Sequence, residues 1–183
     1  MLSQPRSASV EQDTLSKVPL LLLGDISPGV MWEYEYACLG YFYTKDVRPE
    51  KQVRKILARL RDTRVQDWVS INCEHLLGLM FAAFMTEFKS LYLPKDWEEI
   101  MHIELLQMTQ DNDVFWDLAI QVQVKNSILI DTDSYLNKDQ LRNRIEAGMN
   151  PKIALRVHLE KAGNKTKTLV AWIDDIRRCR AEN

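Results

Sequence analysis

The sequence predicts an all-α protein built from two small helical lobes, and three observations support this prediction. Apolar residues recur at helical steps of three and four in nine segments. Only 6 of the 183 residues are glycine, which is unusual for a sheet-rich protein. Hydrophobic residues make up 46% of the chain and charged residues 27%, as in globular proteins with a core of their own.

Residues 1–18 are polar, carry four serines and have no apolar stripe, so they predict a disordered arm. The first lobe is expected over residues 19–110. Ser27 suits a helix N-cap and Pro28 suits the first helical position. One helical face follows them: Met31, Tyr34, Cys38 and Tyr41.

Three further helices complete the expected first lobe, joined by a short segment around Val65 and Trp68. Pro49 opens a helix whose apolar stripe is Val53, Ile56, Leu57 and Leu60. A long helix is predicted from the stripe Leu77, Phe81, Phe84, Phe88 and Leu91. Asp96 and Glu99 form a predicted capping box before Trp97, Met101, Leu105 and Met108.

The polar cluster Thr109 to Asp113 predicts a lobe boundary, with the second lobe over residues 111–183. Its first helix carries Phe115, Leu118, Ala119, Val122, Asn126 and Leu129 on one face. Leu141 and Ile145 predict a short helix that Gly148 follows as the C′ residue. Two last helices carry Ile153, Leu155, Val157 and Leu159, and then Leu169, Trp172, Ile173 and Ile176. An amide on an apolar face needs partners, and a local cap for a loop carbonyl is the favoured role of Asn126.

No motif for catalysis or cofactor binding is present. The glycines fit neither G-x-G-x-x-G nor the Walker A pattern, and no histidine or cysteine cluster has zinc-ligand spacing. Cys73 and His75 are two positions apart, which places them on different sides of a helix. We therefore expect no catalytic residue, cofactor, metal or small-molecule substrate, and interpret Cys38, Cys73 and Cys179 as reduced, partly buried thiols.

Charge is unevenly distributed along the chain. The formal net charge is -2, but residues 138–183 carry 11 Lys+Arg against 6 Asp+Glu, a balance of +5. Nucleic-acid phosphate is the ligand that such a basic segment favours, although cations also suit a helix C-terminus. The candidate contacts are Lys165, Lys167, Arg177, Arg178 and Arg180. No apolar run is long enough to cross a bilayer and no signal peptide is recognisable, so a cytoplasmic location is expected.

The order of aromatic, leucine and polar positions from about Leu60 to Lys161 resembles the Gag capsid region of gypsy-class long-terminal-repeat retrotransposons. The matching positions are Trp68, Phe84, Phe88, Trp97, Gln110, Phe115, Asn126 and Gly148. The stretch LRNRIEAGMNP, Leu141 to Pro151, is similar to a further element of that family, and GDISPGVMWEYEYACLGYF is similar to the opening of its fungal members.

The resemblance implies an N-terminal lobe of about five helices, a C-terminal lobe of about four, and self-association into a shell around element RNA. Two features depart from the family. Asp111, Asn112 and Asp113 stand where the retroviral major homology region has a glycine and a glutamate. The sequence also contains no C-x2-C-x4-H-x4-C knuckle.

Three hypotheses follow, of which a structural, self-assembling Gag-like protein is favoured. The second is a helical adaptor that holds a partner peptide in a groove between helices of the first lobe. The third, an enzyme or DNA-binding regulator, has no motif in its favour. A shell needs two distinct contacts per subunit. We expect one at the short helix around Asp139 to Gly148 and one at the outer side of the first helix, including Trp32 and Tyr36.

Overall fold

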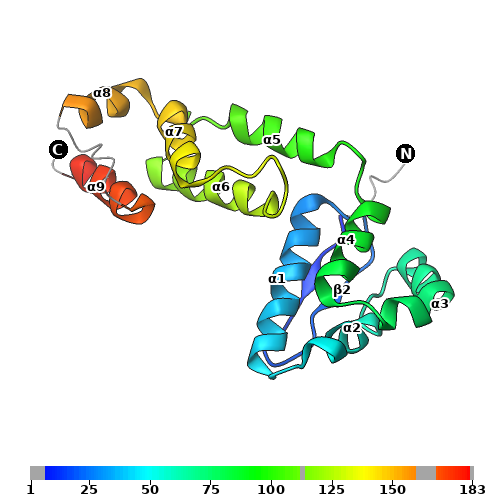
Figure 1. Cartoon of the computed structure of the whole chain (residues 1–183). Coiled ribbons are helices and arrows are strands. Elements are labelled where there is room, and N and C mark those ends of the chain that lie inside the picture. The colour runs from blue at the N-terminus through cyan, green and yellow to red at the C-terminus, as the bar shows by residue number, and fades with distance from the viewer. Residues whose placement is uncertain (1–6, 112–113, 160–167, 182–183) are drawn as a thin grey trace, which may run out of the picture. The chain divides into compact units, whose positions relative to one another are not determined.

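A computed structural model describes residues 7–111, 114–159 and 168–181, with side chains up to residue 178. Nine helices and one two-stranded sheet make up this part of the chain, which confirms the predicted all-α class (Figure 1). The helices are α1 (Pro28–Thr44), α2 (Pro49–Leu57), α3 (Thr63–Leu77), α4 (Phe81–Tyr92), α5 (Trp97–Gln107), α6 (Phe115–Ile128), α7 (Lys138–Gly148), α8 (Pro151–Leu159) and α9 (Leu169–Ala181). The strands are β1 (Val10–Glu11) and β2 (Leu20–Leu21).

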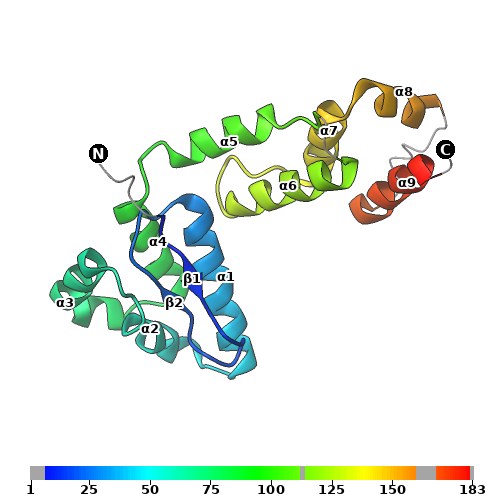
Figure 2. The ribbon, with the colours of Figure 1, turned by 180° about the vertical axis from the view of Figure 1, so that it is seen from behind.

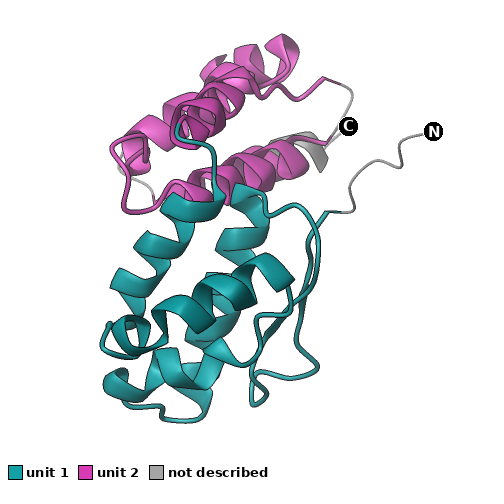
Figure 3. Ribbon diagram, turned by 90° about the vertical axis from the view of Figure 1, so that its right-hand side faces the viewer, with its two compact units in different colours: residues 1–95 teal, residues 96–183 magenta. Residues whose placement is uncertain are grey.

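The chain forms two compact units, Met1–Lys95 and Asp96–Asn183 (Figure 3). This division falls one helix before the predicted boundary at residues 110 and 111. α5 belongs to the second unit because Leu105 is fully buried in its core, with Trp97 and Met101 packed against it. The polar cluster that suggested the boundary is therefore a turn inside the second unit.

Unit 1 is organised around α1 and α4. Ser27 caps α1 by accepting a hydrogen bond from the Val30 amide at 3.3 Å, as predicted. The predicted stripe of α1, Met31 to Tyr41, is buried. α1 and α4 are joined by an edge-on contact of Phe42 with Phe81, whose ring centroids are 5.0 Å apart. An ion pair of Lys89 with Glu35 at 2.6 Å joins the same two helices.

The long helix predicted from Leu77 to Leu91 is wrong, because two helices meet there. α3 ends at Gly78 and α4 begins at Phe81, so the end residues of the predicted stripe lie 39% (Leu77) and 51% (Leu91) exposed. The segment around Trp68, expected to be a short link, lies inside the 15-residue α3. The Trp68 ring stacks on Phe88 at a centroid distance of 5.8 Å.

Residues 7–25 form an extended strap along the helices, where the sequence predicted a disordered arm over residues 1–18. Residues 1–6 lie outside the described part of the chain. β1 pairs antiparallel with β2 and lies against α1 (Figure 2). The other edge of β2 bonds to the segment between α2 and α3: the Leu21 amide donates to Arg59 at 3.3 Å, and the Leu21 carbonyl accepts from Arg61 at 3.0 Å. Leu21 is fully buried.

The core of unit 2 is built by α5 to α9. It contains the predicted apolar residues of α6, together with Leu141, Ile145, Val157, Trp172, Ile173 and Ile176. Asn126 of α6 is buried and makes two hydrogen bonds to the backbone of Leu136, accepting from its amide at 2.9 Å and donating to its carbonyl at 3.0 Å. The favoured role of this amide, a local cap for the loop that follows α6, is confirmed.

Candidate functional site

The outer side of α1 carries an apolar face, here called the α1 face: Trp32, Tyr36, Leu39 and Tyr43. These residues follow one another at steps of four, three and four, which puts them on one side of the helix. Tyr36 is 67% exposed, Leu39 50% and Tyr43 91%, while Trp32 is half-buried. The Trp32 and Tyr36 rings stack with centroids 5.7 Å apart and an interplanar angle of 18°. The predicted contact surface on this helix therefore extends to its C-terminal end.

The second predicted contact surface, on α7, is polar. Leu141, Arg142, Ile145 and Gly148 turn inward and are buried. The exposed positions of α7 are Lys138, Asp139, Gln140, Asn143, Glu146 and Ala147. Unit 2 instead presents apolar side chains on α8, where Leu155 is 63% and Leu159 74% exposed at a spacing of four residues. This pair is here called the α8 face.

Gln110 and Gly148, two positions of the family pattern, meet where α5 approaches the corner between α7 and α8. The Gln110 amide donates to the Gly148 carbonyl at 2.8 Å, and the Gln110 side chain accepts from the Asn150 amide at 3.0 Å. Gly148 ends α7 in a conformation open to any residue, so its predicted C′ role is wrong. It is required for space: a Cβ there would lie 2.7 Å from the Met108 carbonyl oxygen.

Arg144 fixes the same corner to the end of α5. Its guanidinium donates to the Leu105 carbonyl at 3.0 Å and to the Met108 carbonyl. These carbonyls lie at the C-terminus of α5, where a cation also meets the negative end of the helix dipole. Burial lowers the pKa of Arg144. Sequence reasoning missed this residue, because nothing in α7 alone indicates which carbonyls it meets.

Two of the five predicted nucleic-acid contacts, Arg177 and Arg178, have described side chains, and both are exposed on α9. The Arg177 guanidinium lies over the Trp116 ring, 5.3 Å from its centroid, in a cation–π contact. Lys165 and Lys167 lie outside the described residues, and Arg180 lies in α9 with its side chain outside them.

The cysteines differ in environment. Cys38 is fully buried in α1, as expected, and burial raises the pKa of its thiol to about 12. Cys73 is exposed on α3, so the expectation that it is partly buried is wrong. His75 faces away from Cys73 in function as well: its Nε2 pairs with Glu87 of α4 at 2.8 Å.

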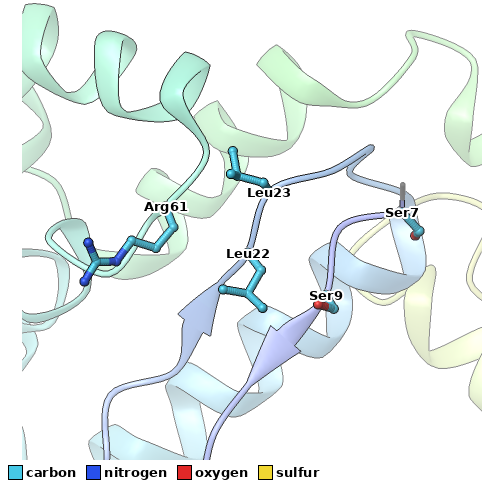
Figure 4. Close-up of a pocket in the computed structure, with 5 residues that line it drawn as sticks. All are labelled: Ser7, Ser9, Leu22, Leu23 and Arg61. Atoms are coloured by element: carbon cyan, nitrogen blue, oxygen red, sulfur yellow. The ribbon is translucent and has the colours of Figure 1, made fainter. Parts of the chain in front are cut away.

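Hollows in unit 1 lie beside the strap. One, of about 430 Å³, is lined by Ser7, Ser9, Leu22, Leu23 and Arg61 (Figure 4). The Arg61 guanidinium points away from the two serines (Figure 4). Beyond this lining, no group of three or more histidine, cysteine, aspartate or glutamate side chains in the described residues is placed to hold a metal ion. None of the described helices combines the length and apolar character that crossing a bilayer requires.

No protein-family model, curated protein or solved structure matches this chain.

Proposed function

We propose that this protein is a structural, capsid-like protein of the Gag type that self-assembles into particles enclosing RNA. One observation carries the proposal: each compact unit presents an apolar face of its own. The α1 face belongs to unit 1 and the α8 face to unit 2. A single isologous contact closes a dimer, whereas two different contacts per subunit allow an assembly to continue. The resemblance of the sequence to Gag capsid regions supports the same function.

The aromatic side chains in these faces are an additional argument for a contact function. Single exposed apolar residues are common on protein surfaces. A run of two tyrosines, a tryptophan and a leucine along one side of α1 is less so, because aromatic residues are enriched in protein interfaces. The four residues are also continuous along the helix, so one flat partner surface can cover them together.

The adaptor hypothesis requires an open groove between helices of unit 1. The space beside the α2–α3 connection is filled by Leu21, which is fully buried and hydrogen-bonded to Arg59 and Arg61. A partner peptide would have to displace this strand. We therefore keep the adaptor as the second candidate, to be decided by experiment.

RNA binding is the least supported part of the proposal, and it rests on the exposed cations of α9. Arg178 is free to meet solvent, and Arg177 combines a cation with the half-buried Trp116 ring. Such a pair suits a sequence-independent contact to single-stranded RNA. If phosphate contacts dominate, log K should fall by about 0.7 per contact against log salt.

The test combines light scattering with nuclease protection. The full chain is brought to rising concentration with and without single-stranded RNA, and negative-stain images are taken of any scattering species. We expect particles whose RNA resists nuclease. Substitution of Arg177, Arg178 and Arg180 by glutamine should reduce protected RNA and leave the particles themselves intact. Particles that form but never protect RNA would remove RNA from the proposal, and a chain that binds peptides while staying monomeric would favour the adaptor.

A further inference from the structure

The α1 face is a continuous strip without an apolar cover in the described part of the chain. It runs from Trp32 to Tyr43, a length of about 16 Å at 1.5 Å per residue. The stacking of Trp32 on Tyr36 holds two of its rings in one orientation before any partner binds. Because the opposite side of α1 is buried in unit 1, the strip is presented by a helix that is fixed at its back.

The area of the strip limits what can cover it. Aromatic side chains bury about 150–250 Å² each, so the exposed fractions of Tyr36, Leu39 and Tyr43 amount to about 400 Å². Two such strips covering each other would bury about 800 Å², roughly half of a standard stable interface. A contact of this size is weak alone and gains strength when other contacts act with it. This is the behaviour that a subunit contact in an assembly requires.

We infer that the α1 face binds the α1 face of a second copy of this chain, with the two helices antiparallel around Leu39. The inference rests on the proposed self-assembly and specifies one of its contacts. A strip that is long and narrow is covered completely only by a partner of the same length lying along it, and an identical helix meets this condition. The contact is isologous, so each copy contributes the same residues.

Charges at the two ends of the strip favour the antiparallel orientation. Glu33 and Lys45 are exposed and lie six residues before and after Leu39. In a parallel pair each charge would lie beside its own copy, Glu33 beside Glu33 and Lys45 beside Lys45. In the antiparallel pair Glu33 of one copy lies at the level of Lys45 of the other, and the two Glu33 side chains are separated by about 18 Å along the axis. The helix dipoles are also opposed rather than aligned.

The first experiment measures self-association of the full chain by sedimentation velocity across a concentration series. The variant is Tyr36→Ser with Tyr43→Ser, and the matched control is Ile71→Ser, which removes an 82% exposed apolar residue from α3 of the same unit. We expect the double variant to raise the concentration needed for association at least tenfold and the control to leave it unchanged. Circular dichroism checks folding, and the single variant Tyr43→Lys, at a 91% exposed position, serves if the double variant unfolds.

The second experiment tests orientation by cross-linking in a Cys73→Ser, Cys179→Ser background. Copies carrying Glu33→Cys are mixed with size-tagged copies carrying Lys45→Cys and treated with a short bismaleimide. The antiparallel pair predicts cross-links between the two kinds of copy. Cross-links of Glu33→Cys copies only to one another would overturn the antiparallel arrangement.

The outcomes separate this inference from the proposed function. If the wild-type chain assembles and the tyrosine variant assembles at the same concentration, the α1 contact is wrong while self-assembly stands. If the wild-type chain remains a monomer at every concentration, self-assembly fails and the α1 face must serve a different partner.

Discussion

At the scale of single residues, the two described cysteines differ in the accessibility and acidity of their thiols. Cys38 is fully buried with its pKa raised to about 12, and Cys73 is exposed. Since the thiolate is the reactive form, we predict that iodoacetamide at pH 8 modifies Cys73 in the folded protein and leaves Cys38 unmodified. Peptide mass spectrometry reads both sites separately. Urea should make Cys38 reactive, and equal rates at both sites in the folded state would contradict the burial of Cys38.

Asp62 links the α3 N-terminus to an ion pair. Its carboxylate accepts from the Arg64 amide at 2.9 Å and pairs with the Arg64 guanidinium at 2.9 Å, which also donates to the Gly24 carbonyl of the strap. The hydrogen bond from the Arg64 side chain is the main cause that lowers the pKa of Asp62. The stabilisation is therefore present above the unfolded-state pKa of about 3.9 and is lost as pH falls through the folded-state value.

Two substitutions separate the cap from the charge of Asp62. Asp62→Asn keeps an oxygen for the Arg64 amide and removes the ion pair, while Asp62→Ala removes both. We predict that the alanine variant loses about 1 kcal/mol more free energy of unfolding than the asparagine variant. In urea titrations, the difference between wild type and Asp62→Asn should shrink as pH is lowered from about 6 toward 2. A difference that grows on acidification would contradict the role given to the carboxylate.

Residue-scale prediction from the sequence succeeded where the signal was local. Asn126 stands out because an amide interrupts an apolar stripe, and its two bonds reach only ten positions along the chain, to Leu136. Arg144 bonds to carbonyls 39 and 36 positions away. No periodicity records such a distance in sequence, so the joint between α5 and α7 had to be seen in the structure.

At the scale of elements, Gly148 provides a test of the α5–α7 joint. A Cβ at Gly148 would lie 2.7 Å from the backbone oxygen of Met108, so Gly148→Ala must displace one of the two segments. We predict a loss of about 1–3 kcal/mol in the free energy of unfolding.

Gly40→Ala is the matched control for that substitution. Its added Cβ would meet only Leu15 Cδ2 at 3.2 Å, the end of an exposed side chain that can move. Gly40 lies inside α1, where alanine is favoured over glycine by about 1 kcal/mol, so we predict no loss or a gain in stability. Urea unfolding measures both variants. A Gly148→Ala protein as stable as wild type would contradict the close approach.

Helices were predictable and the strap was not, for a physical reason. A helix satisfies its backbone within four residues, so spacing and caps such as Ser27 are visible locally. The strap is held by bonds between Leu21 and Arg59 or Arg61, far apart in sequence. Its polar composition therefore suggested disorder. The break between α3 and α4 was missed because the heptad-like spacing continues from Leu77 to Leu91 across it.

At the scale of the whole molecule, the fold class followed from the sequence and the boundary between the units did not. Every helix announces its apolar side, but the side does not say which unit it joins. α5 joins unit 2 through Leu105 and through the bonds that Arg144 makes to its end. Among the predicted contact surfaces, α1 has the apolar face that assembly requires. α7 does not, because Leu141 and Ile145 face the core.

The central claim, that this chain assembles, is tested most directly by sedimentation velocity of the wild-type protein over a wide concentration range, at low and moderate salt. The account predicts a concentration-dependent shift from the 21.4 kDa monomer to species many times heavier, and a stronger shift where salt screens the repulsion between like-charged copies. A single boundary at the monomer mass at every concentration and both salt levels would contradict it.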